Sequence, residues 1–113
     1  MSFYLGQIIL MASHYAPEGW LPCDGQILKV QEHQALYSIL GARFGGDDRK
    51  TFALPDLRNA QPMHAQYKDD IGKQRSSGAV LSKDAASADA LKYLGLTYCI
   101  CVEGGDYPPL PRD

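Results

Sequence analysis

The sequence predicts an α+β fold class, in the form of a small and mainly β domain with short strands and one amphipathic helix. Its apolar stretches are short, rich in β-branched residues and separated by turns that contain proline or glycine. Helical spacing of apolar residues occurs in one place, at about residues 31–40. The chain of 113 residues contains no internal repeat and no linker between two cores. We therefore expect a single domain over residues 1–113.

We expect strands in four stretches where apolar residues gather or alternate, namely residues 5–11, 20–23, 51–54 and 93–102. Pro22 cannot donate to a sheet ladder, so the second of these strands should be short or lie at an edge. Asp24-Gly25 is typical of a tight turn. It predicts a hairpin in which residues 26–30 return along the second strand.

Residues 31–40 are expected to form the helix, because Leu36 and Leu40 fall on one apolar stripe. Gly41 follows at the place where a left-handed residue commonly ends a helix. A helix of this length is marginal alone and must pack on other parts of the chain. We expect the core to consist of large apolar residues from the helix and the strands, namely Trp20, Leu36, Leu40, Phe52 and Leu57.

A long excursion is predicted at about residues 59–90, where small, polar and charged residues dominate. Loops of this length in a compact domain usually carry function or lack order. Residues 82–90 within the excursion are compatible with a brief helical turn.

The composition indicates a folded protein without a nucleic-acid or membrane partner. Apolar residues make up 45% and charged residues 21%, an ordinary globular balance. A net charge of −2 supplies no field that attracts nucleic acid or an anionic membrane. No stretch approaches the ~20 apolar residues of a membrane span, and no segment has the pattern of a signal peptide. We expect no membrane insertion, and a chain that stays in the cytoplasm or leaves it by a route such as cell lysis.

Motifs that support catalysis are missing from the sequence. It contains no phosphate-binding loop, no dinucleotide fingerprint and no Gly-x-Ser-x-Gly elbow. Asp47-Asp48 lacks the ligand ladder of a calcium loop and is interpreted as an Asp-rich turn. We therefore expect no enzyme activity, no catalytic residue and no cofactor.

The three cysteines are an odd number, and Cys99 and Cys101 alternate along one expected strand. Residues two apart on a strand are separated by ~6.6 Å, a poor geometry for a disulfide. We expect three buried or partly buried free thiols. The alternative is a bridge from Cys23 to one of the others, if the chain is extracellular.

A series of motifs between residues 6 and 58 resembles the phage tail-collar family, which includes the microcystin-dependent proteins of bacteria. The motifs run in order, almost without gaps: Gly6-Gln7-Ile8, Ala16-Pro17-Glu18-Gly19-Trp20, Cys23-Asp24-Gly25-Gln26, Gln34-Ala35-Leu36-Tyr37-Ser38-Ile39-Leu40-Gly41, Phe44-Gly45-Gly46-Asp47 and Thr51-Phe52-Ala53-Leu54-Pro55-Asp56-Leu57-Arg58. Residues 96–104 are similar to the closing strand of the family. The resemblance implies a trimeric module of tail fibres or fibre-like surface appendages, with structural or adhesive roles and no known catalysis.

Within these motifs, Asp24, Gly25 and the segment Pro55-Asp56-Leu57-Arg58 are expected to act as scaffold. Asp56 and Arg58 are placed to form an ion pair, either buried at a subunit contact or exposed on the surface. Many relatives continue with Gly-Arg and a long variable region. Here Asn59-Ala60 follows, and the excursion is shorter than the variable region of those relatives. The resemblance therefore suggests a reduced version that serves as a tip, cap or connector.

Four residues of the excursion are candidates for contact with a ligand or partner: His64, Tyr67, Asp69 and Asp70. The sequence predicts no metal site, apart from the hypothesis that three copies of His64 meet on a threefold axis and bind a metal. Partners implied by the resemblance are identical or related chains in a homotrimer or heterotrimer, other tail or fibre proteins, and a host surface glycan. The main hypothesis is a structural module of a virion tail or extracellular appendage, and the alternative is a receptor- or glycan-binding adhesin tip.

Overall fold

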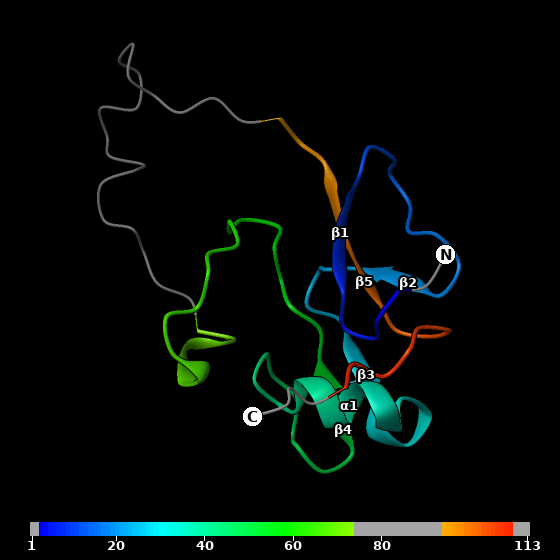
Figure 1. The fold of residues 1–113 in the computed structure, drawn as a ribbon, viewed down its shortest axis with the longest axis vertical. Helices are drawn as coiled ribbons and strands as arrows, with labels where there is room; N and C mark the ends of the chain where they lie inside the picture. Colours follow the sequence, from blue (N-terminus) through cyan, green and yellow to red (C-terminus); the bar gives the residue numbers. More distant parts are fainter. Residues whose placement is uncertain (1–2, 74–93, 110–113) are drawn as a thin grey trace.

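The computed structural model describes residues 3–73 and 94–109 (Figure 1). Three strands form the first sheet: β1 (Ile8–Met11), β2 (Trp20–Pro22) and β5 (Thr97–Cys101). The order is β1-β5-β2, and both pairings are antiparallel. Ile100 of β5 lies opposite Ile8 on one side and Leu21 on the other. The last strand of the chain is therefore the centre of its sheet, and the two earlier strands are its edges.

The second sheet has two antiparallel strands, β3 (Ile27–Lys29) and β4 (Thr51–Ala53). This arrangement contradicts the predicted hairpin, because β3 pairs with β4 and β2 pairs with β5. Asp24-Gly25 does turn the chain, and Gly25 has a positive φ of 78°. The turn directs β3 into another sheet because Gln26 and Leu54 are joined by a backbone hydrogen bond of 3.0 Å. The predicted α+β class is confirmed, and the described residues form short strands in two sheets and one α-helix.

The helical region is shorter than predicted and interrupted. A 3-10 turn, η1 (Val30–Glu32), precedes the α-helix α1 (Gln34–Leu40). Between them His33 has φ −137° and ψ 51°, which no helix contains, so the expected helix over 31–40 breaks there. The predicted end is correct: Gly41 has φ 60°, and its N–H donates to the carbonyl of Tyr37 at 2.7 Å.

One cluster of buried side chains joins the helix and both sheets. Leu36 and Leu40 of α1 and Phe52 of β4 are buried in it, with Ile100 of β5, and Leu57 is partly buried against it. The side chain of Phe52 is fully buried and its ring lies 5.5 Å from that of Tyr37. These contacts fix the position of the second sheet relative to the first.

Trp20 does not lie in the core, in contrast to our expectation. It is partly exposed on edge strand β2 and packs edge-on against Phe3, with ring centroids 5.2 Å apart. Successive residues of a strand point to opposite faces. On β2 the core-facing position belongs to Leu21, which packs against the buried cluster.

The final strand also begins later than expected, at Thr97 and not at about residue 93. Leu94, which the alternating pattern placed in it, is 82% exposed. The predicted helical turn at 82–90 lies outside the described residues. From the excursion the structure describes residues 59–73, which include one 3-10 turn, η2 (Lys68–Asp70).

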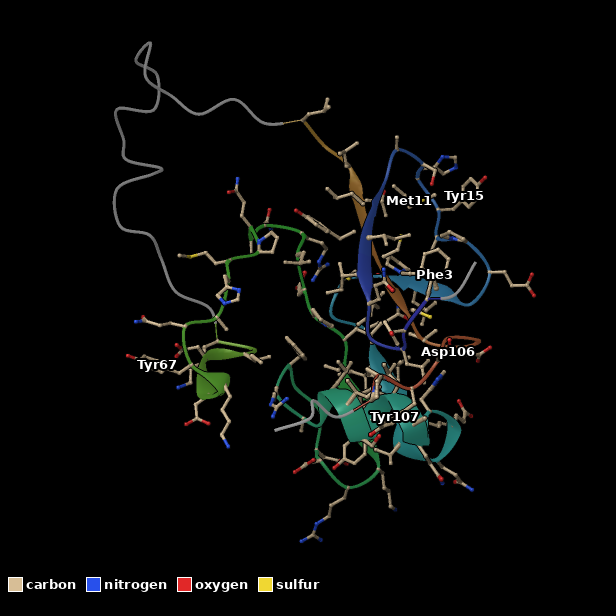
Figure 2. The ribbon with its side chains drawn as sticks, viewed as in Figure 1. Phe3, Met11, Tyr15, Tyr67, Asp106 and Tyr107 are labelled. Carbon is tan, nitrogen blue, oxygen red and sulfur yellow. The ribbon has the colours of Figure 1, made fainter. Side chains whose placement is uncertain are left out.

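The segment that follows β5 returns to the start of the chain. Tyr4 and Asp106 form an isolated parallel bridge, and the N–H of Asp106 donates to the carbonyl of Phe3 at 2.7 Å. Tyr107 then lies over α1, where its hydroxyl is 3.0 Å from that of Ser38 (Figure 2). Within residues 3–73 and 94–109, no helix is long and apolar enough to cross a membrane.

Candidate functional site

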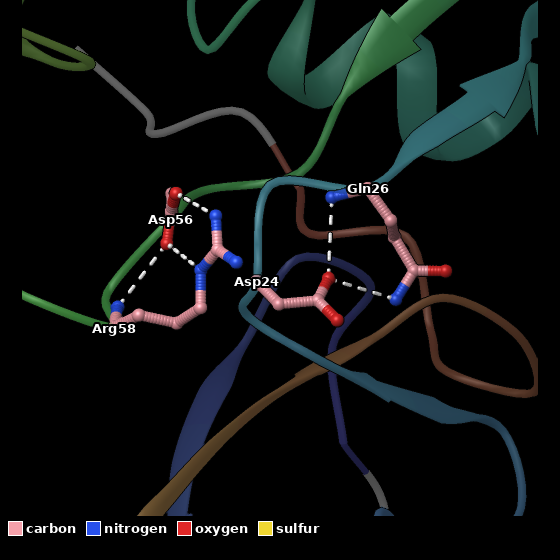
Figure 3. Close-up of polar contacts among 4 residues, drawn as sticks. All are labelled: Asp24, Gln26, Asp56 and Arg58. Atoms are coloured by element: carbon pink, nitrogen blue, oxygen red, sulfur yellow. Dashed lines mark hydrogen bonds and ion pairs between the residues drawn. The ribbon is translucent and has the colours of Figure 1, made fainter.

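The turn after β2 is held by the side chain of Asp24 (Figure 3). Its Oδ1 accepts hydrogen bonds from the backbone N–H of Gln26 at 3.2 Å and from the side-chain amide of Gln26 at 3.1 Å. An aspartate that bonds the backbone two residues later is a common way to stabilise a turn. The Oδ2 of Asp24 accepts no hydrogen bond within the described part of the chain.

In the turn after β4 an aspartate again accepts the backbone N–H of the residue two positions later, and here it also forms an ion pair. Oδ1 of Asp56 accepts from the backbone N–H of Arg58 at 3.2 Å and from Nε of Arg58 at 2.9 Å, and Oδ2 accepts from Nη2 at 2.7 Å (Figure 3). These bonds lower the pKa of Asp56 to about 2, the hydrogen bond from the Arg58 side chain being the largest cause. The predicted ion pair therefore forms. In the single chain it is exposed, with 66% of the Arg58 side chain and 42% of the Asp56 side chain accessible to solvent.

The two turns meet in space. Asp24 and Asp56 form an isolated antiparallel bridge, and the N–H of Leu57 donates to the carbonyl of Cys23 at 2.9 Å. A Cβ on Gly25 would lie 3.2 Å from the Cβ of Asp56, so glycine serves both the positive φ and the close approach. We call Asp24, Gly25, Gln26, Asp56 and Arg58 the turn junction. It connects the end of β2 to the end of β4, and thereby one sheet to the other.

A shallow pocket of about 300 Å³ opens beside the turn junction. Asp24 and Arg58 line it together with Leu96, Thr97 and Tyr98, at and just before the start of β5. Its lining thus combines an acidic, a basic and an aromatic residue from three separate segments of the chain.

Asp47 organises the loop between α1 and β4. Its Oδ1 accepts the backbone N–H groups of Arg49, Lys50 and Thr51 at 2.9, 2.8 and 2.9 Å. These backbone hydrogen bonds, Arg49 first, lower its pKa to about 2. The interpretation of Asp47-Asp48 as an Asp-rich turn did not include these hydrogen bonds from the backbone of the loop to Asp47. The available signal was an aspartate directly after two glycines and four residues before the strand at Thr51.

Comparison with protein families identifies the module that contains these turns. The model of the family described as the phage tail collar domain matches residues 6–62, which is half of the chain. The chain belongs to the phage tail collar domain family. No curated protein and no solved structure matched it.

The matched region of the collar domain includes both halves of the turn junction, but not β5. The family is a structural one of phage tail fibres and not a family of enzymes. The collar domain is accordingly a structural module of a phage tail, and the turn junction belongs to its architecture.

The four candidate residues of the excursion lie apart from the turn junction. His64, Tyr67 and Asp69 are exposed, and Asp70 is partly buried. Tyr67 lies on the part of the excursion beside η2, away from the two sheets (Figure 2). Asp70 accepts the backbone N–H of Tyr67 at 3.3 Å and so stabilises η2. Among residues 3–73 and 94–109, no group of three metal-ligating side chains occurs.

The three cysteines of the chain are free and buried, as the sequence predicted. Burial raises the pKa of the Cys23 thiol to about 12, with a smaller contribution from Cys99. Burial likewise raises the pKa values of Cys99 and Cys101. All three side chains are therefore neutral thiols at physiological pH.

Proposed function

We propose that this collar domain is a non-enzymatic structural module that assembles as a trimer in a phage tail fibre or tail-like appendage. The family supports a structural role in a tail. The observation that supports assembly is the apolar surface of edge strand β1.

In β1, Ile8 is 41% and Leu10 is 51% exposed. No Lys, Arg, Asp or Glu occurs among residues 1–17. Isolated proteins usually protect an edge strand with charged residues, proline or a bulge, because unpaired backbone groups invite pairing with another chain. β1 has none of these protections in its own sequence. In the proposed trimer, a neighbouring chain covers the edge of β1.

The test is the solution mass by light scattering behind size exclusion. We expect three times the chain mass. Leu10→Lys places a charge on β1 and should give a monomer, because burying an unpaired charge at an interface is strongly unfavourable. Ile27→Lys is the matched control, since Ile27 is similarly exposed, at 57%, but lies on β3. A native protein that remains a monomer at all concentrations, or a trimer insensitive to Leu10→Lys, would contradict the proposal.

Whether the trimer contains identical or related chains is tested by expressing this chain alone and measuring the same mass. A trimer of the single chain supports a homotrimer, and a monomer that becomes trimeric with other fibre chains supports a heterotrimer. Labelling of particles with an antibody against the collar domain should place it at the virion tail or appendage.

A second candidate function is attachment to a host glycan through the excursion. It is favoured by Tyr67, a residue that is 66% exposed beside a short turn held by Asp70. Exposed tyrosines commonly anchor contacts because they present a large rigid ring with a polar end. Binding to immobilised host glycans that Tyr67→Ala abolishes would support this function, and binding unaffected by that substitution would count against it.

A further inference from the structure

We propose that the pocket beside the turn junction binds a single neutral sugar unit. The proposal does not depend on trimer assembly, and it places the ligand on the scaffold and not on the excursion. It follows from the hydrogen-bonding groups that line the pocket, from their charge and from its size.

The first argument is the supply of prearranged polar groups. Arg58 uses Nε and Nη2 for Asp56. Because a guanidinium carries five N–H groups, three remain for a ligand. Asp24 also lines the pocket, and its Oδ2 accepts no hydrogen bond within the described part of the chain, while Oδ1 is held by Gln26. Each side chain is thus held in place by some of its polar atoms, and its other polar atoms are available to a ligand. A hydroxyl group that donates to Asp24 and accepts from Arg58 satisfies both.

The second argument is charge. The turn junction carries two carboxylates and one guanidinium, so its net charge is negative. Phosphates, sulfates and sugar acids are disfavoured by this field, whereas neutral hydroxyl groups are not. Leu96 and Tyr98 also line the pocket, and apolar and aromatic residues suit the apolar face of a sugar ring.

The third argument is size. A volume of about 300 Å³ is at the lower limit of small-molecule sites and suits one sugar ring with its hydration. A free monosaccharide and the terminal unit of a glycan share this chemistry. The pocket is open on one side, so we expect weak binding with a Kd on the order of 1 mM.

The experiment is titration of the full chain, labelled with ¹⁵N, with glucose, methyl glucoside, methyl galactoside and N-acetylglucosamine. We expect shifts at the amides of residues 96–98 and at the side-chain N–H of Arg58. Glucuronic acid, which is anionic, should cause none. Equal binding of free glucose and its methyl glycoside indicates that the terminal unit of a glycan fits, while binding of the free sugar alone indicates a monosaccharide ligand. Absence of shifts at this pocket with every neutral sugar would overturn the proposal.

Asp24→Asn is the decisive variant. Asparagine keeps an oxygen for Gln26 but replaces Oδ2 by a donor, so the fold should be retained while the Kd rises about tenfold or more. Tyr67→Ala is the matched control and should leave the Kd unchanged. The opposite result, in which Tyr67→Ala alone loses binding, would overturn the proposal and indicate that the sugar binds at the excursion. The solution mass of both variants, measured in parallel, separates this outcome from any failure of trimer assembly.

Discussion

Asp24 and Asp56 form an isolated antiparallel bridge, although they belong to turns that follow strands of different sheets. Each aspartate also accepts the backbone N–H of the residue two positions later, Gln26 and Arg58 respectively. The bridge therefore joins two turns that are each already stabilised locally. The sensitivity of the Asp56 turn to acid, and of both turns to substitution, follows from these bonds.

The carboxyl group of Asp56 should titrate far below the usual range. Its folded pKa of about 2 lies below the ordinary value of 3.8, so its contribution to stability is present above pH 3.8 and is lost as the pH falls through 2. In Arg58→Met the pKa should rise toward 3.8, and the remaining backbone hydrogen bond should keep it somewhat lower. An NMR titration of the Asp56 carboxyl carbon measures both values. An identical pKa in the variant would show that Arg58 does not hold this group.

The loop before β4 should depend on one side chain. Asp47→Ala removes the acceptor of three backbone N–H groups, and we expect the melting temperature to fall by several degrees. Asp47→Asn retains an oxygen at this place and should recover much of the loss. Asp69→Ala, on the exposed turn η2, serves as the control. A melting temperature equal to that of the control would rule out this role for Asp47.

Phe52 should matter more to stability than Trp20. Phe52 is fully buried, and Phe52→Ala is expected to cost ~3–5 kcal/mol in the free energy of unfolding. Trp20→Ala should cost less, because its ring is partly exposed at a sheet edge. Urea unfolding of both variants gives the comparison. A larger cost for Trp20→Ala than for Phe52→Ala, or a Trp20→Ala variant that fails to fold where Phe52→Ala folds, would be inconsistent with this placement.

Cys23 should react slowly with thiol reagents in the folded protein. Burial raises its pKa to about 12, and the reactive thiolate is therefore scarce up to at least pH 9. Labelling with an aromatic disulfide reagent at pH 8 should be slow in buffer and rapid in denaturant. The unfolded protein also provides the control for reagent quality. Fast labelling of Cys23 under native conditions would contradict its burial.

Features determined by local chemistry were predictable from the sequence. Pro22 indicated a short or edge strand, Gly41 indicated the end of the helix, and both predictions are confirmed. The Asp56–Arg58 pair was also foreseen because its partners are two residues apart.

Features determined by contacts between distant residues were not predictable in the same way. The Asp24-Gly25 turn favoured residues 26–30 as the partner of β2, whereas in the folded chain β2 pairs with residues 97–101 of β5, more than 70 positions away. Likewise, the turn junction was predicted as two separate motifs, because nothing local indicates that Asp24 and Asp56 meet.

The central position of β5 has a consequence for synthesis of the protein on the ribosome. β1 and β2 emerge early but pair only with β5, so the first sheet cannot form until residue 101 has left the exit tunnel. A nascent chain that contains the whole matched region, residues 6–62, still exposes two unpaired apolar strands. Such strands are prone to aggregation and are typical clients of chaperones. Translation that stops before β5 should therefore yield a product for degradation and not a smaller version of the module.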